Sequence, residues 1–409
     1  MTHPHRKTLA VWQPFFLGGG AEAVALWLLA ALVDDYDVTL YTISGVDLAK
    51  LDAMYGTALA QSPSLQVQAL LPSRYTRWVD GLIANFSWAQ ILFNHLSLRG
   101  FKRVSADCDL PISAFNAVDL GKPGFQYLHW VNVVEKSWKQ AGPVMKLALW
   151  LSNFSEERLK ANASVANSHH TAEKVMETYG IAAPVLYPPV VSDLVPVPWE
   201  DKEDAFLCSG RVVFAKQTHR VIEILAAVRQ RGFNVKLYIT GGGGGTYGWG
   251  YQNKVRKLAR AHADWVTYYE NLPYADYLQV VGRCRYGIHH KPEPFGISVA
   301  EMVKAGLIPF VCSRGGQIEI VNAANTDLIF IKAQDAVDKI AAVLANPHRQ
   351  QELRASLAQQ SPLFSTERFT QEIQAAVAQC LTSSTTTSST ITTSATSSPP
   401  PSDTSPSPA

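Results

Sequence analysis

Residues 286–306 read YGIHHKPEPFGISVAEMVKAG, an apolar strand followed by a Pro-Phe-Gly turn and a short helix that ends at a glycine. A strand that passes through a tight turn into a helix is the repeating unit of a parallel sheet covered by helices. Two carboxylates lie eight positions apart, Glu293 before the turn and Glu301 inside the helix. An ion pair needs no glycine at the bend, whereas a ligand that approaches the backbone closely does. We therefore predict a ligand site at this turn.

The same alternation of apolar strands and helical patterns runs along the whole chain. The first half contains predicted strands at residues 8–14, 37–43, 109–116, 125–130 and 163–168. The second half repeats the pattern with strands at residues 205–211, 235–241, 265–270, 286–291, 307–313 and 328–332. This rhythm predicts an α/β fold of two Rossmann-like, doubly wound parallel-sheet domains that face a central cleft. Ligands of such sheets bind outside the carboxyl ends of the strands.

Changes in composition divide the chain. Proline and charge density rise at residues 188–204, which indicates an interdomain linker. The predicted domains span residues 1–190 and 204–364, and an amphipathic helix at 365–381 is expected to brace them. Residues 382–409 are mostly Ser, Thr and Pro with few apolar side chains, so we predict a disordered tail there.

The composition also excludes several classes of protein. The net charge of the 409 residues is +2, so no global field draws the chain to nucleic acid. The five cysteines are scattered without a Cys-x-x-Cys pair, which favours a reducing compartment and argues against a structural zinc site. The sequence shows neither the apolar core of a signal peptide nor an apolar run of transmembrane length. We therefore expect a cytoplasmic protein that contacts a membrane only from its surface.

Two glycine-rich loops follow strands. Gly18, Gly19 and Gly20 separate the first strand from the first helix, where glycines admit a ligand close to the backbone and the helix start favours an anion. A tight turn without a ligand is the alternative, and the loop does not match the Gly-x-Gly-x-x-Gly pattern of dinucleotide sites. The run Gly241–Gly245 is interpreted as a flexible loop over the cleft.

Two cations follow the first strand of the second half. Arg211 and Lys216 can neutralise a diphosphate, the arginine as a fork and the lysine as a point charge. An exposed basic pair is the alternative, and it is favoured if these two residues are taken alone. If the helix of the opening stretch begins near Gly296, its free amides face the cations, Glu293 can accept hydrogen bonds from sugar hydroxyls, and Glu301 from a ribose. A capped helix with an exposed glutamate explains neither the glycine bend nor the paired cations.

These motifs together resemble a known family. In chain order they are the glycine-rich loop, YLHW, VANS, YPPV, SGR with a lysine beyond it, EPFGISVAE and SRGGQIEIV. This order is similar to that of retaining GT-B glycosyltransferases of the family-four type, which include sucrose synthases, phosphatidylinositol mannosyltransferases and mannosyltransferases of lipid-linked oligosaccharide assembly. The resemblance covers nearly the whole chain apart from the tail. It implies a nucleotide-sugar donor held mainly by the second domain and an acceptor held mainly by the first.

The resemblance also implies roles for individual residues. The implied catalytic residues are Glu293 at the donor sugar, His129 at the transferred sugar, and Arg211 and Lys216 at the diphosphate. The implied donor-binding residues are Gly19, Gly20, Arg211, Lys216, Phe295, Gly296, Ile297 and Glu301, the last of which would hold the ribose. A histidine that only fills the core is the alternative for His129. Glu319 matches a family acid of mostly structural role.

One departure from the family pattern is the pair His289 and His290, which we expect to modify the pocket. An adjacent histidine pair is not a metal site without further ligands, and neither a metal nor another cofactor is expected.

The function implied by the resemblance is a retaining, metal-independent hexosyltransferase. It would move a hexosyl group from a nucleoside diphosphate sugar to the hydroxyl of a glycan or lipid-linked acceptor. No residue stands out as a nucleophile. The resemblance implies that retention is achieved on one face of the sugar, with the leaving diphosphate taking the acceptor proton. The alternatives are an epimerase or disaccharide synthase of the same architecture, and a non-catalytic sugar-nucleotide-binding protein.

Residues 74–103 of the acceptor domain carry a further pattern. Large apolar residues form a helical stripe: Trp78, Leu82, Phe86, Phe93 and Leu96. Basic residues lie toward the ends of the segment: Arg74, Arg77, Arg99, Lys102 and Arg103. A helix packed on its sheet is the favoured interpretation, and peripheral contact with a membrane surface or a lipid phosphate is the alternative.

Overall fold

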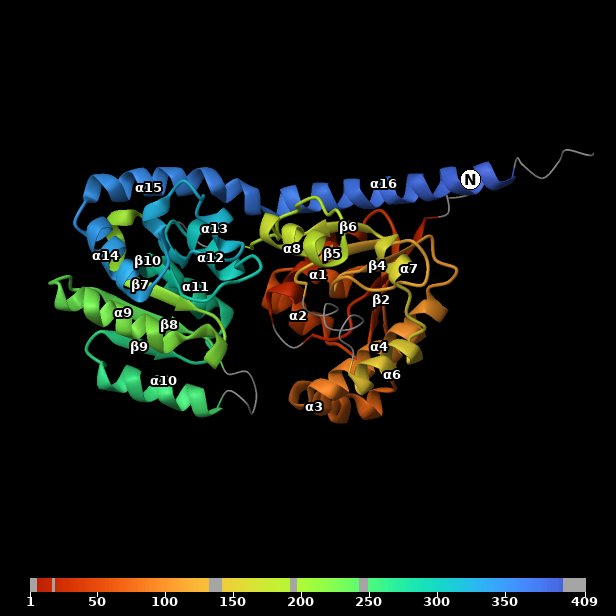
Figure 1. Cartoon of the computed structure of the whole chain (residues 1–409), viewed down its shortest axis with the longest axis horizontal. Helices are drawn as coiled ribbons and strands as arrows, with labels where there is room; N and C mark the ends of the chain where they lie inside the picture. The colour runs from red at the N-terminus through yellow and green to blue at the C-terminus, as the bar shows by residue number, and fades with distance from the viewer. Residues whose placement is uncertain (1–5, 17–18, 132–141, 192–196, 243–248, 393–409) are drawn as a thin grey trace, which may run out of the picture.

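The computed structural model describes residues 6–16, 19–131, 142–191, 197–242 and 249–392, which form two α/β domains (Figure 1). The first sheet contains β1 (Thr8–Trp12), β2 (Asp37–Thr42), β3 (Leu65–Ala69), β4 (Leu110–Ser113), β5 (Phe125–Leu128) and β6 (Ala163–Ala166). The second contains β7 (Glu203–Ser209), β8 (Lys236–Thr240), β9 (Val266–Tyr269), β10 (Cys284–His289), β11 (Ile308–Cys312) and β12 (Ile329–Phe330).

The two sheets have the same topology. Their strand orders are β3-β2-β1-β4-β5-β6 and β12-β11-β10-β7-β8-β9, and every neighbouring pair is parallel. Counted within each domain, both orders are 3-2-1-4-5-6, which is the doubly wound arrangement with a switch point beside the first strand. The prediction of two doubly wound parallel-sheet domains is confirmed.

The burial of a strand explains whether it could be predicted from the sequence. Leu9 and Val11 of β1 are at most 1% exposed, and Val11 pairs with Leu40 on one side and Ile112 on the other. A strand covered on both faces is a continuous apolar run, and such runs are visible in the sequence. The edge strand β3 was not among the predicted strands, because its sequence LQVQA alternates with glutamine and its centre is exposed.

Helices cover both sheets. Those of the first domain are α1 (Gly20–Leu32), α2 (Leu48–Tyr55), α3 (Thr76–Asn85), α4 (Ser87–Val104), α6 (Pro143–Leu151), α7 (Glu156–Lys160) and α8 (His169–Tyr179). Those of the second are α9 (Thr218–Gln230), α10 (Trp249–Ala261), α11 (Tyr274–Arg283), α12 (Ile297–Lys304), α13 (Gln317–Ile320), α14 (Ala333–Leu344) and α15 (Pro347–Gln360). Within the described ranges, none of these helices is long and apolar enough to cross a membrane.

The last helix, α16 (Thr366–Thr392), returns the chain to the first domain and lies along it (Figure 1). Its buried residues Phe369, Ile373, Val377 and Leu381 recur every fourth position and join the core that contains α1. The preceding Phe364 belongs to the core of the second domain. The helix was predicted at residues 365–381, and in the structure it extends eleven residues further, into the predicted tail. Residues 393–409 lie outside the described part.

The predicted stripe at residues 74–103 is not one packed helix. Phe86 is extended, with φ −131° and ψ 114°, and separates α3 from α4. Trp78, Phe86 and Leu96 are 64%, 46% and 46% exposed, so the interpretation that the stripe packs on the sheet is wrong for these three residues. Among the described side chains of α3, Val79 and Ile83 are the ones buried in the core. The buried face of α3 therefore differs from the predicted stripe.

Candidate functional site

The loop between β10 and α12 is built around glycines. Gly296 caps α12 with φ 112° and ψ 59°, a conformation that favours glycine. A Cβ on Gly315 would lie 2.4 Å from the Glu293 carbonyl oxygen, and one on Gly316 would lie 2.1 Å from that of Pro294. The two glycines after β11 therefore let the chain pack directly on the backbone that carries Glu293.

Gln317 fixes the same loop with its side chain. Its Oε1 accepts a hydrogen bond of 2.8 Å from the amide of Glu293, and its Nε2 donates to the Arg314 carbonyl at 2.6 Å. Gln317 is fully buried, so these bonds are shielded from water. Gln317 was not among the predicted site residues, because an isolated glutamine carries no signal of such a role.

Glu293 lies among three nitrogens of neighbouring side chains. Its Oε1 is 2.5 Å from Lys216 Nζ, 3.4 Å from His289 Nε2 and 3.6 Å from Lys291 Nζ. Burial opposes ionisation of Glu293, but His289 and Lys216 outweigh it and lower the pKa of Glu293 to about 2. Burial is also the main cause that lowers the pKa of His289. The cluster therefore holds an ionised glutamate and a neutral histidine near neutral pH.

His290 does not join this cluster by any described contact. Its ring lies 5.8 Å from that of Phe330. Both histidines nevertheless line the small cavity that contains Lys216, and among the described residues His289 is the one of the pair beside Glu293.

Arg211 lies in the loop after β7, and its side chain is exposed. Within the described part of the chain, its guanidinium forms no hydrogen bond or ion pair. Together with Lys216 and His289 it lines a small cavity at the carboxyl end of β7. A Cβ on Gly241 would lie 2.0 Å from the Gly210 carbonyl oxygen, so this glycine is needed for close packing beside Arg211. Residues 243–245 of the predicted flexible loop lie outside the described part.

A cavity of about 420 Å³ lies between the two domains. The first domain contributes Gly19 and Gly20, and the second contributes Ile297 and Glu301 with Tyr277. The structure therefore brings together donor-binding residues predicted on separate domains.

Glu301 faces this cavity from the middle of α12. Its Oε2 accepts a hydrogen bond of 2.7 Å from the Tyr277 hydroxyl, which itself accepts one of 3.2 Å from Ser209. Burial raises the pKa of Glu301 to about 7, although the bond from Tyr277 acts in the opposite direction. The pKa of Glu301 is therefore raised and that of Glu293 lowered, although the two residues are only eight positions apart.

The glycine loop of the first domain contacts both domains. The amide of Gly19 donates a hydrogen bond of 3.0 Å to the Tyr55 hydroxyl. A Cβ on Gly20 would lie 2.4 Å from Cδ1 of Ile297, so Gly20 lets the second domain approach the start of α1. Phe295, beside Gly296, is 2% exposed and packs in the core of the second domain. Its side chain is structural, which leaves only its backbone for a ligand.

His129 follows β5 and is buried. Its Nε2 lies 2.9 Å from the Ala114 carbonyl oxygen, and its amide donates to Asn116 Oδ1 at 2.9 Å. Burial lowers the pKa of His129 to about 4. Its ring is not among the described residues that line the interdomain cavity. The structure therefore does not bring His129 into contact with Glu293 or Glu301.

Polar contacts connect the first domain to the Glu293 loop and to α13 of the second domain. Ser168 Oγ donates to the Pro294 carbonyl at 2.6 Å. Glu319 accepts hydrogen bonds of 2.9 Å from the amides of His169 and His170, and one of 3.0 Å from the Tyr187 hydroxyl. The Glu319 carboxylate thus caps the N-terminus of α8 from the opposite domain.

The described residues contain no group of three or more His, Cys, Asp or Glu side chains that could hold a metal ion. The charges at the site come instead from Arg211, Lys216, Lys291 and the acids. The cations and the free amides of α12 can bind an anion, and the acids can accept hydrogen bonds from hydroxyl groups.

Comparisons with known proteins agree with this architecture. Residues 194–362 match the family model described as glycosyl transferases group 1. A search of curated proteins gives no match. Among solved structures, HepE from Anabaena in complex with UDP and glucose is 16% identical, with a TM-score of 0.66 over 91% of this chain and 100% of that chain.

Two further structures show the same likeness. Sucrose-phosphate synthase from Thermosynechococcus elongatus is 17% identical, with a TM-score of 0.66 over 92% of this chain and 100% of that chain. WaaG, a glycosyltransferase involved in lipopolysaccharide biosynthesis, is 14% identical, with a TM-score of 0.62 over 89% of this chain and 99% of that chain. The second domain therefore matches the glycosyl transferase group 1 domain, and the whole chain has the GT-B fold.

Proposed function

We propose that this protein is a retaining, metal-independent hexosyltransferase that uses a nucleoside diphosphate sugar. The observation that carries the proposal is that the Lys216–Glu293 pair, Arg211 and the glycine-capped start of α12 all lie at the carboxyl ends of β7 and β10. This arrangement offers positive charge for a diphosphate and a carboxylate for sugar hydroxyls. The match of residues 194–362 to glycosyl transferases group 1 supports this assignment.

The donor is proposed to lie across the carboxyl ends of β7 and β10. Arg211, Lys216 and the first amides of α12 would bind its diphosphate, and Glu301 would accept hydrogen bonds from its ribose. Glu293 would contact the sugar, together with the backbone of Phe295, Gly296 and Ile297. The complexes of HepE with UDP and with UDP-glucose favour a uridine nucleotide as the first donor to test.

The transfer step requires no protein nucleophile. The bond between the anomeric carbon and the diphosphate oxygen breaks while the acceptor oxygen bonds to that carbon on the same face. The acceptor proton passes to the leaving diphosphate oxygen. Arg211 and Lys216 would stabilise the charge that develops on the diphosphate. Because Glu293 already holds Lys216 at 2.5 Å, this lysine would bridge the sugar site and the phosphate site.

The test is binding and turnover with a panel of UDP-, GDP- and ADP-sugars. Calorimetry on the full chain identifies the donor, and product analysis identifies the reaction. Release of a nucleoside diphosphate with net transfer or hydrolysis supports the transferase. A change of sugar stereochemistry with the donor alone would indicate the epimerase instead. Binding without any turnover, with every acceptor tested, would favour the non-catalytic alternative.

The acceptor is proposed to be glycan or lipid-linked, and to be presented at an anionic membrane surface on the cytoplasmic side. Large apolar side chains are exposed on α3, α4 and α6 and at the α3–α4 junction, at one end of the first domain (Figure 1). They form what we call the apolar end surface: Trp78, Phe86, Trp88, Leu96, Val144, Leu147 and Trp150. Exposed cations on the same helices and beside α3 are Arg74, Arg99, Arg103 and Lys146. Aromatic residues with surrounding cations suit a membrane interface.

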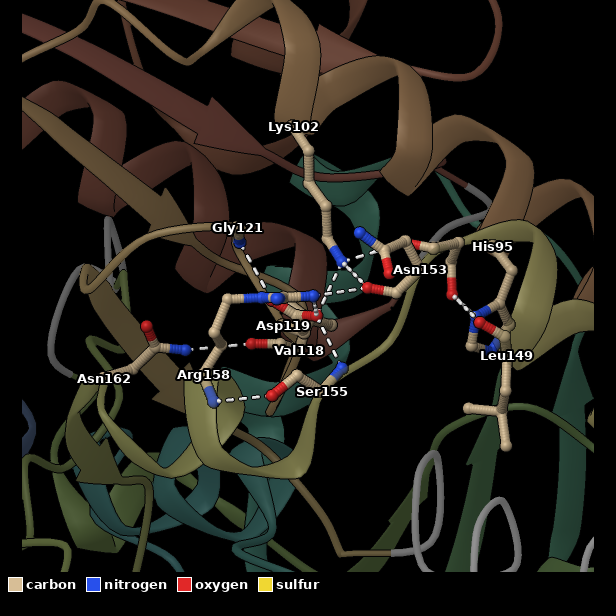
Figure 2. Close-up of polar contacts among 11 residues, drawn as sticks. His95, Lys102, Val118, Asp119, Gly121, Leu149, Asn153, Ser155, Arg158 and Asn162 are labelled. Atoms are coloured by element: carbon tan, nitrogen blue, oxygen red, sulfur yellow. Dashed lines mark hydrogen bonds and ion pairs between the residues drawn. The ribbon is translucent and has the colours of Figure 1, made fainter.

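One cation of residues 74–103 has a different role. Lys102 Nζ lies 2.6 Å from Asp119 Oδ2, which also lies 2.9 Å from Arg158 Nη2, and the Asp119 side chain is fully buried (Figure 2). Lys102 also donates to the Ser152 carbonyl at 3.0 Å, beyond the end of α6. This cluster fixes α4 relative to α6 and α7, so Lys102 is a structural residue beneath the surface. The side chain of Arg77 lies outside the described part.

Vesicle flotation tests the membrane contact. The full chain should bind phosphatidylglycerol vesicles more tightly than phosphatidylcholine vesicles, and Trp150→Ser should weaken binding. Ile331→Ser is the matched control, because Ile331 and Trp150 are both 73% exposed and Ile331 lies on the second domain. Equal binding by both variants and the parent chain would reject the apolar end surface as the contact.

A further inference from the structure

A cavity of about 900 Å³ lies at the amino-terminal ends of the strands of the second sheet. The proposed donor site lies at the carboxyl ends of the same strands. The walls of the cavity come from residues 197–202 before β7, from the end of α12, from α15 and from Gly282 at the end of α11. These segments lie where β7, β10 and β11 begin, whereas Arg211 and Glu293 lie where β7 and β10 end. Helix α12 starts at the Glu293 loop and ends in the cavity wall, so its length separates the two sites.

Lys202 places a buried cation in the wall of this cavity. The residue is 6% exposed, and its Nζ donates a hydrogen bond of 2.6 Å to the Gly282 carbonyl. In the described part of the chain it forms no ion pair with a carboxylate. An ammonium group has three donors, and a buried charge without a counter-ion is unfavourable.

Arg354 of α15 is a second cation of the same wall. Its guanidinium lies 4.4 Å from the centre of the Trp199 ring, and among the described residues it has no ion pair. Arg285, whose guanidinium lies 5.4 Å from the same ring, is instead neutralised by Asp204 at 2.8 Å. Burial lowers the pKa of Lys202, and Arg354 acts in the same direction. Two cations thus line one wall, and among the described residues neither forms an ion pair with a carboxylate.

The remaining charged groups of the wall do not cancel this charge. Lys304 adds a third cation and donates to the Val190 carbonyl. Glu200 is the acid of the described lining; it is exposed, and it forms no ion pair with Lys202 or Arg354. The cavity wall therefore has a net positive charge. It lies at the amino-terminal ends of the strands, away from the proposed transfer reaction.

We infer that this cavity binds a small phosphate ester, with the phosphate between Lys202 and Arg354 and the organic part in the rest of the cavity. Arginine binds phosphate as a planar fork and lysine as a point charge, so the pair suits a tetrahedral dianion. The volume is far larger than one phosphate, which favours a ligand of about the size of a phosphorylated sugar. This site goes beyond the proposed donor and acceptor sites and does not depend on them.

Both cations also have structural contacts, but of different kinds: Arg354 packs on the Trp199 ring, whereas Lys202 binds a helix end. Lys202 caps the last turn of α11 through Gly282, as cations often do at the C-terminal ends of helices. Arg354 makes no such contact with a helix end. Variants of Arg354 therefore distinguish an anion site from a helix cap.

The experiment is calorimetric titration of the full chain with glucose 6-phosphate and with inorganic phosphate. Saturating UDP blocks the cations of the proposed donor site during the titration. We expect Arg354→Gln to weaken glucose 6-phosphate binding about tenfold to a hundredfold, the range for one charge-assisted hydrogen bond. Lys202→Met, which keeps the aliphatic stem, should weaken it similarly. If Lys202→Met does not fold, Arg354→Gln alone decides.

The controls separate this inference from the proposed function. Arg260→Gln changes an exposed arginine on α10 and should leave both ligands unaffected. Arg211→Gln should weaken UDP binding but not glucose 6-phosphate binding, even if the protein transfers no sugar. Competition between UDP and glucose 6-phosphate, an unchanged affinity in Arg354→Gln, or no binding at all would overturn the inference. Equal affinities for glucose 6-phosphate and inorganic phosphate would also overturn it, because the site would then recognise the free anion.

Discussion

Lys216 Nζ lies 2.5 Å from Glu293 Oε1, and this contact joins two loops that are 77 positions apart in the sequence. The loops follow β7 and β10, which are neighbours in the sheet. The pair explains why a glutamate in a half-buried loop stays ionised. It also means that a diphosphate bound to Lys216 would meet a cation already shared with Glu293. The proposed sugar and phosphate sites are therefore electrostatically coupled.

Glutamine substitution should separate the two acids of the opening stretch. At about pH 8, Glu301→Gln should reduce affinity for the bare nucleoside diphosphate about tenfold to a hundredfold, because a charge-assisted hydrogen bond contributes about 1.5–3 kcal/mol. Glu293→Gln should leave that affinity unchanged or higher, since it releases Lys216, and should depress turnover instead. Calorimetry with the nucleotide, alongside turnover of the sugar nucleotide, measures both effects. An equal loss of nucleotide affinity in the two variants would contradict this division.

The same two acids should affect stability in opposite pH windows. The pKa of Glu293 falls from 4.5 to about 2 on folding, so its contribution is present above pH 4.5 and is lost as the pH falls toward 2. The pKa of Glu301 rises from 4.5 to about 7, so the folded state binds the extra proton between these values and stability falls as the pH rises.

Denaturant unfolding from low to neutral pH tests this pair of effects. Glu301→Gln should flatten the fall in stability above pH 4.5, by at most about 3.5 kcal/mol at about 1.4 kcal/mol per pKa unit. Glu293→Gln should flatten the rise below that pH. Parallel curves for both variants and the parent chain would show that neither carboxylate has the surroundings described.

Chelation should leave transfer intact if Arg211, Lys216 and the start of α12 neutralise the diphosphate. We expect full activity in excess EDTA once the donor is identified, because fixed cations replace a divalent ion. The control is the same assay with added manganese, which should give no stimulation. Activity that EDTA abolishes and manganese restores would assign the charge stabilisation to a metal.

The last helix should be needed as far as its buried stripe. A chain that ends at Leu381 should fold and turn over normally, whereas one that ends at Arg368 loses all four buried residues of α16. Phe369 is fully buried, so Phe369→Ala should lower the free energy of unfolding by about 3–5 kcal/mol. Gln371→Ala, at an exposed position of the same helix, should change it by less than about 0.5 kcal/mol. Denaturant unfolding compares the variants.

Glu319 should hold the two domains together in the absence of ligand. Glu319→Ala removes the acceptor for the amides of His169 and His170, so we expect a loss of about 1–3 kcal/mol and a larger radius of gyration. Small-angle scattering and thermal unfolding measure the two effects. Glu173→Gln, at an exposed position of α8, is the control. A compact Glu319→Ala variant of unchanged stability would show that the cap contributes nothing to domain closure.

Local chemistry determined much of this structure. The buried strands of both sheets are apolar runs, and the turns between strands and helices contain glycines, so two doubly wound domains could be predicted from the sequence. The glycine at position 296, between Glu293 and Glu301, indicated a turn after a strand, and the structure places this turn between β10 and α12. The polar edge strand β3 could not be predicted in this way, because its exposed residues form no apolar run. The break at Phe86 could not be predicted either, because no proline or glycine marks it in the sequence.

Tertiary structure decided which of these residues meet. The pairing of Lys216 with Glu293, of Tyr277 with Glu301 and of Glu319 with α8 depends on strand order and on the docking of the two domains. Hydrogen bonds and ion pairs act over a few ångströms, whereas their partners are separated by tens of residues in the sequence. The sequence by itself therefore determined the two sheets and the edge at which the site lies. Only the folded chain decided that Glu293 is held ionised by Lys216 and His289, whereas burial raises the pKa of Glu301.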